Sequence, residues 1–388
     1  MLFRSYAPVG SHKDLLAYLM RRLLENGANS SFINHLFDEN IKPNELASDV
    51  LSEVESDPQA NHPKIPLPKD IYQPARGNSK SIVLSEQDEV DTLSDAQKPW
   101  LDCQWHADSI VATQVDTDNV QHQVLNPADL SDILGYVAFA DEVQIKQCVL
   151  DAKVAFASNG HSPESILVNL ERAADLFEAS QAELMALAMR EAGKTYQDAI
   201  DEVREAVDFL RYYANIARDV MPNKREALGV FVCISPWNFP LAIFTGQVAA
   251  ALAAGNSVMA KPAESTSLMA YRATQLLHEA GIPLGLLQLV LGKGADVGEV
   301  LTSDASISGV AFTGSTQVAK RIKRNLLVNN ARLIAETGGL NAMVVDSTAL
   351  SEQVTRDVID SAFKSAGQRR SEERRVGKEC RSRWSPYH

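Results

Sequence analysis

Short apolar runs alternate with helical patterns in the second half of the chain. Four such runs occupy residues 230–234, 257–260, 287–291 and 309–312. Each is four or five residues long and apolar almost throughout, as in strands that are buried on both faces. Between them, residues 241–254 and 268–280 carry apolar side chains at helical spacing and are followed by a glycine at which a helix can end. This alternation predicts an α/β fold with a Rossmann-like parallel sheet.

Helical patterns also dominate the part of the chain that precedes this sheet. They cover residues 142–156, 165–179, 184–191 and 196–214. Asp141 is placed to cap the first of them, and Gly193 follows the third. Residues 110–115 and 120–124 predict a strand pair, and 135–140 a further strand. We assign these helices a structural role and no chemistry.

Polar residues follow two of the predicted parallel strands directly. The turn at 235–240 contains Asn238, and the second strand ends at Lys261 and Glu264. Ligands in open α/β sheets bind outside the carboxyl ends of the strands. The turn at 292–298 contains three glycines but lacks the GxGxxG fingerprint. Ser315 begins a predicted helix and fits either a phosphate donor or a simple cap.

Composition and charge narrow the class of protein. The 388 residues carry a net charge of −13, which argues against a general nucleic-acid binder. The four cysteines form no CxxC pair, so neither a metal site nor a disulfide framework is indicated, and a reducing cytoplasm fits best. The apolar run 241–254 is too short to span a bilayer, and no signal peptide is evident at the start.

Four short motifs follow one another in an order typical of one enzyme family. They read PWNFP at residues 236–240, KPAE at 261–264, FTGST at 312–316 and ETGG at 336–339. With these motifs the chain resembles the aldehyde dehydrogenase superfamily. The resemblance implies the N-terminal, cofactor-binding half of that fold, NAD as cofactor and a small-molecule aldehyde as substrate.

The resemblance also implies roles for particular residues. Asn238 corresponds to the oxyanion donor and Glu336 to the general base. Glu264 corresponds to a carboxylate that holds ribose hydroxyls, which favours NAD over NADP. The implied contacts to the cofactor are Ser235, Trp237, Lys261, Glu264, Gly294, Gly298, Phe312, Gly314 and Ser315.

The nucleophile of the family is missing from its position. Residues 367–369 read Gly-Gln-Arg, which resembles the start of the family's Gly-Gln-x-Cys motif, yet Arg370 stands where the cysteine belongs. Residues 370–388 carry a charge of +3 against −16 for the preceding 369 residues, and they resemble nothing in the family. We interpret them as a non-native tail. Cys380 lies ten residues late on this tail and is a poor candidate for a preorganised thiolate. The chain as written is therefore expected to be inactive.

The N-terminal residues carry a second resemblance. Residues 6–32 resemble the last helix of the proline dehydrogenase barrel in the proline utilization A family of bifunctional bacterial enzymes. In that family the equivalents of Tyr6, Tyr18, Arg21 and Arg22 lie at the proline site, and a guanidinium suits a carboxylate. A (β/α)₈ barrel needs about 200 residues or more. We therefore expect an isolated terminal helix of the barrel, with no proline oxidation and no binding of the FAD that the parent enzyme uses.

Together these features predict four segments. Residues 1–38 form the barrel remnant, 39–105 a linker, 106–369 the cofactor-binding half and 370–388 the tail. The chain is then a fragment of an NAD-dependent L-glutamate γ-semialdehyde dehydrogenase whose parent is a homo-oligomer. Two alternatives stay open: a non-catalytic NAD-binding fragment, and a piece of a single-function aldehyde dehydrogenase with another substrate. A helical interaction protein would not explain the ordered motifs.

Overall fold

The computed structural model describes residues 65–115, 120–158, 160–220, 226–339 and 342–368, and residues 15, 16, 18–21, 24, 42 and 55 singly. The chain divides into two compact units, Met1–Leu67 and Pro68–His388. The second unit contains the sheet and the candidate site.

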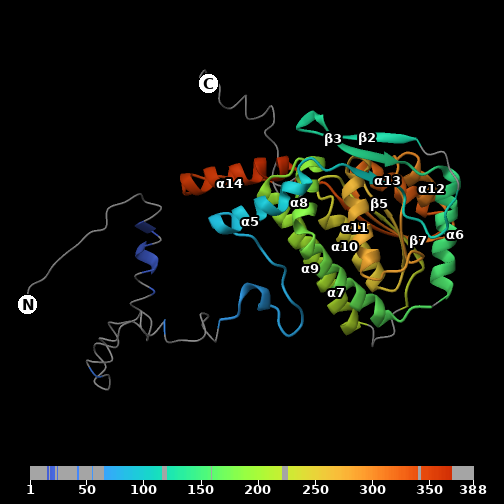
Figure 1. Cartoon of the computed structure of the whole chain (residues 1–388), viewed down its shortest axis with the longest axis horizontal. Helices are drawn as coiled ribbons and strands as arrows, with labels where there is room; N and C mark the ends of the chain where they lie inside the picture. The colour runs from blue at the N-terminus through green and yellow to red at the C-terminus, as the bar shows by residue number, and fades with distance from the viewer. Residues whose placement is uncertain are drawn as a thin grey trace, which may run out of the picture. The chain divides into compact units, whose positions relative to one another are not determined.

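A five-stranded parallel sheet forms the centre of the second unit (Figure 1). Its strands are β4 (Val230–Ile234), β5 (Ser257–Lys261), β6 (Leu287–Leu289), β7 (Ile307–Gly314) and β8 (Arg332–Thr337), in the spatial order β6-β5-β4-β7-β8. The chain runs outward from β4 to β6 and then returns to the other side of β4. The predicted parallel sheet is thereby confirmed.

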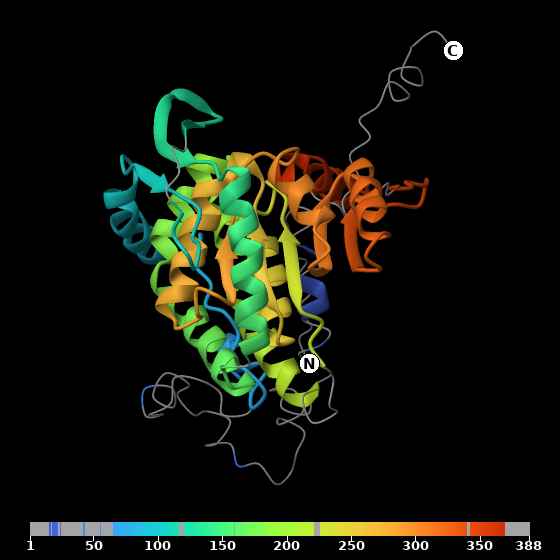
Figure 2. The ribbon, with the colours of Figure 1, turned by 90° about the vertical axis from the view of Figure 1, so that its right-hand side faces the viewer.

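Helices cover both faces of this sheet. Successive side chains along a strand point alternately into two hydrophobic clusters, one on each face. Phe231 and Cys233 face the cluster that includes α10 (Ala242–Ala253) and α11 (Ser267–Glu279), whereas Val230 and Val232 face the opposite cluster. The opposite cluster includes α6 (Glu142–Ser158), α12 (Val297–Ser303) and α13 (Thr316–Leu326). Figure 2 shows α6 lying along this face of the sheet. Burial on both faces explains why the central strands are apolar throughout.

Three further helices form an outer layer on the α10 side. They are α7 (Pro163–Ala179), α8 (Gln181–Ala192) and α9 (Tyr196–Val220). Phe177 of α7 and Phe244 of α10 are fully buried between these elements. Asp141 accepts a hydrogen bond from the backbone N–H of Gln144, and Gly193 ends α8 with a left-handed backbone. The predicted cap and helix end are both confirmed.

A separate three-stranded sheet corrects one prediction. It contains β1 (Trp105–Ala107), β2 (Gln121–Asn126) and β3 (Asp129–Ala138), and β3 lies between the other two. The predicted strand at 110–115 is wrong, because in that range Ile110 alone bridges to Leu289. The true partner of β2 is β3, which begins six residues earlier than predicted.

Several elements were not predicted. They are η1 (Pro68–Asp70), α5 (Gln87–Gln97), η2 (Lys98–Trp100), β1, η4 (Glu264–Thr266), β8, α14 (Ser351–Phe363) and η5 (Lys364–Gly367). The first three lie in the range predicted as linker. Leu93 of α5 and Trp105 of β1 belong to the same hydrophobic cluster as α7 and α8. Trp105 also donates a hydrogen bond to Glu183. The linker range therefore contributes to the core of the second unit.

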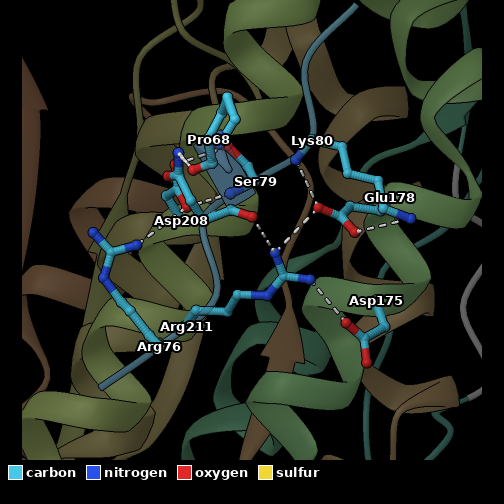
Figure 3. Close-up of polar contacts among 9 residues, drawn as sticks. Pro68, Arg76, Ser79, Lys80, Asp175, Glu178, Asp208 and Arg211 are labelled. Atoms are coloured by element: carbon cyan, nitrogen blue, oxygen red, sulfur yellow. Dashed lines mark hydrogen bonds and ion pairs between the residues drawn. The ribbon is translucent and has the colours of Figure 1, made fainter. Parts of the chain in front are cut away.

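The segment 68–80 is held on the surface of α7 and α9 by polar contacts (Figure 3). Asp208 of α9 accepts hydrogen bonds from the backbone N–H and the hydroxyl of Ser79, at 2.9 and 2.8 Å, and from Arg76 at 3.3 Å. Glu178 of α7 accepts a bond from the backbone N–H of Lys80. Arg211 donates both to Glu178 and to the backbone of residue 78. Bonds from two helices thus hold this one segment in place.

Replacing Asp208 by alanine should release this segment. Three hydrogen bonds are lost, and each is worth about 1 kcal/mol at a partly exposed site. We expect trypsin to cleave after Arg76 or Lys80 several-fold faster, as followed by mass spectrometry. Asp201→Ala is the matched control, because Asp201 lies on the same helix and accepts a bond from Gln197 within it. Equal cleavage rates in the two variants would contradict the assignment.

The first unit is described at few positions. Residues 15, 16, 18–21 and 24 are helical, as predicted for this stretch. Leu16, Leu19 and Leu24 are exposed, and Arg21 is exposed as well. Tyr6 and Arg22, which the sequence also assigned to a proline-site remnant, lie outside the described residues.

Candidate functional site

The candidate site lies at the carboxyl ends of the parallel strands. The strand order reverses between β4 and β7, which are neighbours in space and are separated by β5 and β6 along the chain. The connections that leave β4 and β7 therefore diverge, and open α/β sheets bind their ligands at such a point. The predicted catalytic and cofactor-binding residues that the structure describes follow or end β4, β5, β6, β7 and β8, and so they share the carboxyl side of the sheet.

The turn after β4 carries three predicted residues. Ser235 is buried, and its backbone N–H donates to the carbonyl of Lys261 at 3.2 Å, which joins the ends of β4 and β5. Among the described residues, its hydroxyl has no hydrogen-bond partner. Trp237 is 43% exposed. Asn238 is half-buried, and its side-chain amide donates to the carbonyl of Gln368. The turn thus presents a buried hydroxyl and an oriented amide.

Lys261 and Glu264 lie at the end of β5. Lys261 is 3% exposed, and burial lowers the pKa of its ammonium to about 8 against the opposing effect of Glu264. Its ammonium donates to the carbonyl of Pro262 at 2.9 Å. Glu264 is exposed and accepts a hydrogen bond from the backbone N–H of Gly294 at 3.1 Å. This hydrogen bond joins the connection after β5 to the connection after β6.

β7 and its exit carry three more predicted residues. Phe312 is buried in the sheet, and a Cβ added to Gly314 would lie 2.6 Å from its ring, so a larger residue here would force the ring to move. Ser315 accepts a hydrogen bond from the N–H of Val318 and is thus the N-cap of α13. The structure supports the cap, one of its two predicted roles. Gly298 lies at the start of α12, where a Cβ would meet open space.

Glu336 lies near the carboxyl end of the edge strand β8. It is exposed and aligned in register with Thr313 of β7. Thr313 accepts a hydrogen bond from Gln247 of α10. The predicted general base therefore stands on a strand next to the strand that ends at Gly314.

No thiolate is available among the described cysteines. Burial raises the pKa of the Cys148 thiol to about 12 and raises the pKa of Cys233 further. The pKa of Cys103 is also raised, mainly by burial. Cys380 lies outside the described residues, and so does Arg370, for which the sequence predicts the nucleophile position. Burial thus disfavours the thiolate form of each described cysteine.

Three buried charged residues near the site were not predicted. Glu191 accepts hydrogen bonds from the N–H groups of Leu268 and Met269 in the first turn of α11. Burial raises the pKa of Glu191 to about 8. Glu202 and Lys194 form an ion pair of 3.1 Å with side chains 1% and 4% exposed. The burial of Glu202 could have been predicted from the sequence, because this residue lies within the apolar stripe of α9.

The donors and acceptors at this edge suit a dinucleotide. An ammonium beside a carboxylate can donate to and accept from the two hydroxyls of a ribose. The orphaned hydroxyl of Ser235 and the N-terminus of α13 offer further polar contacts. Among the described residues there is no group of His, Cys, Asp and Glu that could hold a metal ion. None of the described helices is long and apolar enough to cross a membrane.

Comparisons with known proteins agree with both resemblances. The family model described as "Aldehyde dehydrogenase family" matches residues 114–377, and the one described as "Proline dehydrogenase" matches residues 2–35. The bifunctional protein PutA of Klebsiella aerogenes is 50% identical over 383 residues, which cover 94% of this chain and 29% of that protein. The chain thus spans less than a third of this relative.

Single-function enzymes match the dehydrogenase part. The 1-pyrroline-5-carboxylate dehydrogenase of Geobacillus thermodenitrificans is 37% identical over 265 residues, covering 63% of this chain and 52% of that enzyme. The structure of the 1-pyrroline-5-carboxylate dehydrogenase from Thermus with bound NAD has a TM-score of 0.72 and 30% identity, and the match covers 76% of this chain and 62% of that one.

Proposed function

Because the chain belongs to the aldehyde dehydrogenase family, we propose that residues 106–369 are the NAD-binding half of an enzyme that oxidises an aldehyde. The observation that carries this proposal is the position of Asn238, Lys261, Glu264 and Ser315 at one edge of the sheet, beside its switch point. An NAD-bound relative of the same fold supports the choice of cofactor.

The substrate proposed for the parent enzyme is L-glutamate γ-semialdehyde. The match to proline dehydrogenase at residues 2–35 and the likeness to PutA and 1-pyrroline-5-carboxylate dehydrogenase support it. A single-function aldehyde dehydrogenase would have no use for residues 2–35. In this proposal residues 1–38 are the barrel remnant, which does not bind FAD, 39–105 connect the modules, and 370–388 are a non-native tail. The parent is a cytoplasmic homo-oligomer.

In the parent enzyme, the residues that this chain retains would have separate tasks in the reaction. The Asn238 amide donates to the oxyanion that forms when a thiolate attacks the aldehyde. Lys261 and Glu264 hold the ribose hydroxyls of the cofactor, with Ser235, Trp237, Gly294, Gly298, Phe312, Gly314 and Ser315 as further contacts. Glu336 accepts a proton from the water that hydrolyses the thioester. Bound NAD supplies the acceptor for the hydride.

This chain itself is proposed to bind NAD without oxidising aldehydes. Arg370 stands where the thiolate is required, and its guanidinium is neither nucleophilic nor able to form a thioester. The amide, the carboxylates and the lysine are all retained. The chain is therefore proposed to keep the residues for NAD binding and to lack the nucleophile for aldehyde oxidation.

A fluorescence titration with NADH tests this function. We expect saturable binding to the full chain and no NADH formation with glutamate semialdehyde and NAD. Glu264→Gln should weaken binding about tenfold, because a charge-assisted hydrogen bond to the ribose is lost. The glutamine keeps an oxygen that can accept from the Gly294 N–H.

Glu279→Gln serves as the matched control for this titration. Glu279 is an exposed carboxylate at the far end of α11 and pairs with Arg272. It should leave NADH affinity unchanged. If the unmodified chain does not bind NADH at millimolar concentration, or if it oxidises the semialdehyde, the proposal is wrong.

A further inference from the structure

A buried polar cluster connects three segments that are far apart in the chain. Lys194 follows α8, Glu202 belongs to α9 and Ser365 lies in η5. The Lys194 ammonium lies 3.1 Å from Glu202 and donates to the Ser365 hydroxyl at 2.8 Å. All three residues are buried. A buried ion pair gains little net stability over apolar residues of similar size, so its value lies in fixing a particular arrangement.

The Glu202 end of the cluster holds the turn that carries the oxyanion donor. The second carboxylate oxygen of Glu202, which does not contact Lys194, accepts hydrogen bonds from the backbone N–H groups of Leu241 and Ala242, at 3.2 and 2.9 Å. These amides begin α10, and α10 has no side-chain cap of its own. The Lys194 ammonium also lies 4.2 Å from the ring centroid of Phe239. Both charges of the pair thus contact the chain within four residues of Asn238.

The Ser365 end holds the loop that leads to the nucleophile position. Ser365 and Gly367 have φ angles of 50° and 63°, and the left-handed conformation is costly for serine. A hydrogen bond from a buried ammonium can offset that cost. Three residues later, the Gln368 carbonyl accepts from Asn238. The loop is therefore held at two points, immediately before residue 370.

We propose that Lys194 is a positioning residue that sets the loop 364–368 against the turn 236–242. It donates to Ser365 on the loop and pairs with Glu202, which holds the turn. This proposal rests on the proposed function, which identifies the turn 236–242 as the carrier of the oxyanion donor and the loop 364–368 as the segment before the nucleophile position. In an enzyme with a cysteine after this loop, the arrangement would set the nucleophile relative to the oxyanion donor, without Lys194 touching the substrate.

Hydrogen exchange of the full chain, measured by mass spectrometry, tests this role. Lys194→Met should speed exchange about tenfold or more in peptides that cover both 364–368 and 238–242. Ser365→Ala should speed it only in the peptide over 364–368, because Glu202 still caps α10. The double variant should match Lys194→Met in that peptide, since both changes remove the same bond. Lys153→Met, at an exposed position of α6, is the control.

If Lys194 contributed only to the global stability of the fold, the exchange rates would change in a different pattern. Exchange would then rise throughout the core, and Ser365→Ala would leave 364–368 within twofold of the unmodified chain. Either result overturns the proposal. Should Lys194→Met fail to fold, Ser365→Ala decides alone. NADH binding is measured on the same unmodified sample, so its failure rejects the proposed function and leaves the exchange result standing.

Discussion

Replacing Glu202 by alanine is expected to lower the free energy of unfolding by about 3–5 kcal/mol, the cost of removing one partner of a buried ion pair. The change leaves the Lys194 ammonium buried without its carboxylate, at side-chain exposures of 4% and 1% for the two partners. It also uncaps the N–H groups of Leu241 and Ala242. Urea denaturation followed by circular dichroism measures the loss as a lower midpoint.

Two further variants make this test specific. Glu279→Ala breaks the surface pair with Arg272 and should cost less than about 1 kcal/mol. Lys194→Met combined with Glu202→Leu removes both buried charges and should recover part of the loss. It should not recover all of it, because α10 stays uncapped. A loss below about 1 kcal/mol for Glu202→Ala would show that the pair is solvated.

The second large effect is a fall in stability with rising pH that depends on Glu191. Burial raises the pKa of this carboxyl to about 8 in the folded chain, whereas its ordinary value is 4.5. Between these values the folded chain binds more protons than the unfolded chain, so stability decreases as the pH increases. The slope due to this group approaches about 1.4 kcal/mol per pH unit within the window.

Glu191→Gln should flatten this slope between pH 5 and pH 8. Glutamine has a single acceptor oxygen for the two N–H groups of α11, so the variant should be the less stable form at pH 5. The difference should shrink or reverse toward pH 8. Urea denaturation at each pH unit measures it, and other titrating groups cancel because both proteins carry them. Parallel curves for the two proteins would refute the buried, protonated state of Glu191.

The central strands could be predicted from the sequence because burial on both faces leaves a plain pattern. Val230–Ile234 was predicted at its observed bounds, and Ser257–Lys261 was missed by a single residue. β8 was missed because it is a mostly exposed edge strand that forms by pairing with β7, and its apolar run, 333–335, is only three residues long. α14 was missed although Val354, Val358 and Ala362 recur at helical spacing, and none of its described residues is buried in the structure.

The sequence predicts the positions of those site residues that belong to a motif directly after a predicted strand. Asn238, Lys261 and Glu264 lie at strand ends where the sequence placed them. The contacts that hold these ends in place depend on tertiary structure, and local patterns do not contain them. Lys194 looks like any exposed lysine after a helix-ending glycine, and only the approach of Glu202 and Ser365 makes it a buried charge.

The bond between Lys194 and Ser365 spans 171 residues of sequence. A ribosome adds about 5–20 residues per second, so roughly 10–30 s separate the synthesis of its two ends. During that interval the helices and most strands can fold, while the lysine already pairs with Glu202 and still has a proton to donate. The loop at 364–368 is therefore synthesised after the strand ends that carry Asn238, Lys261 and Glu264, and it docks against elements that can already be folded.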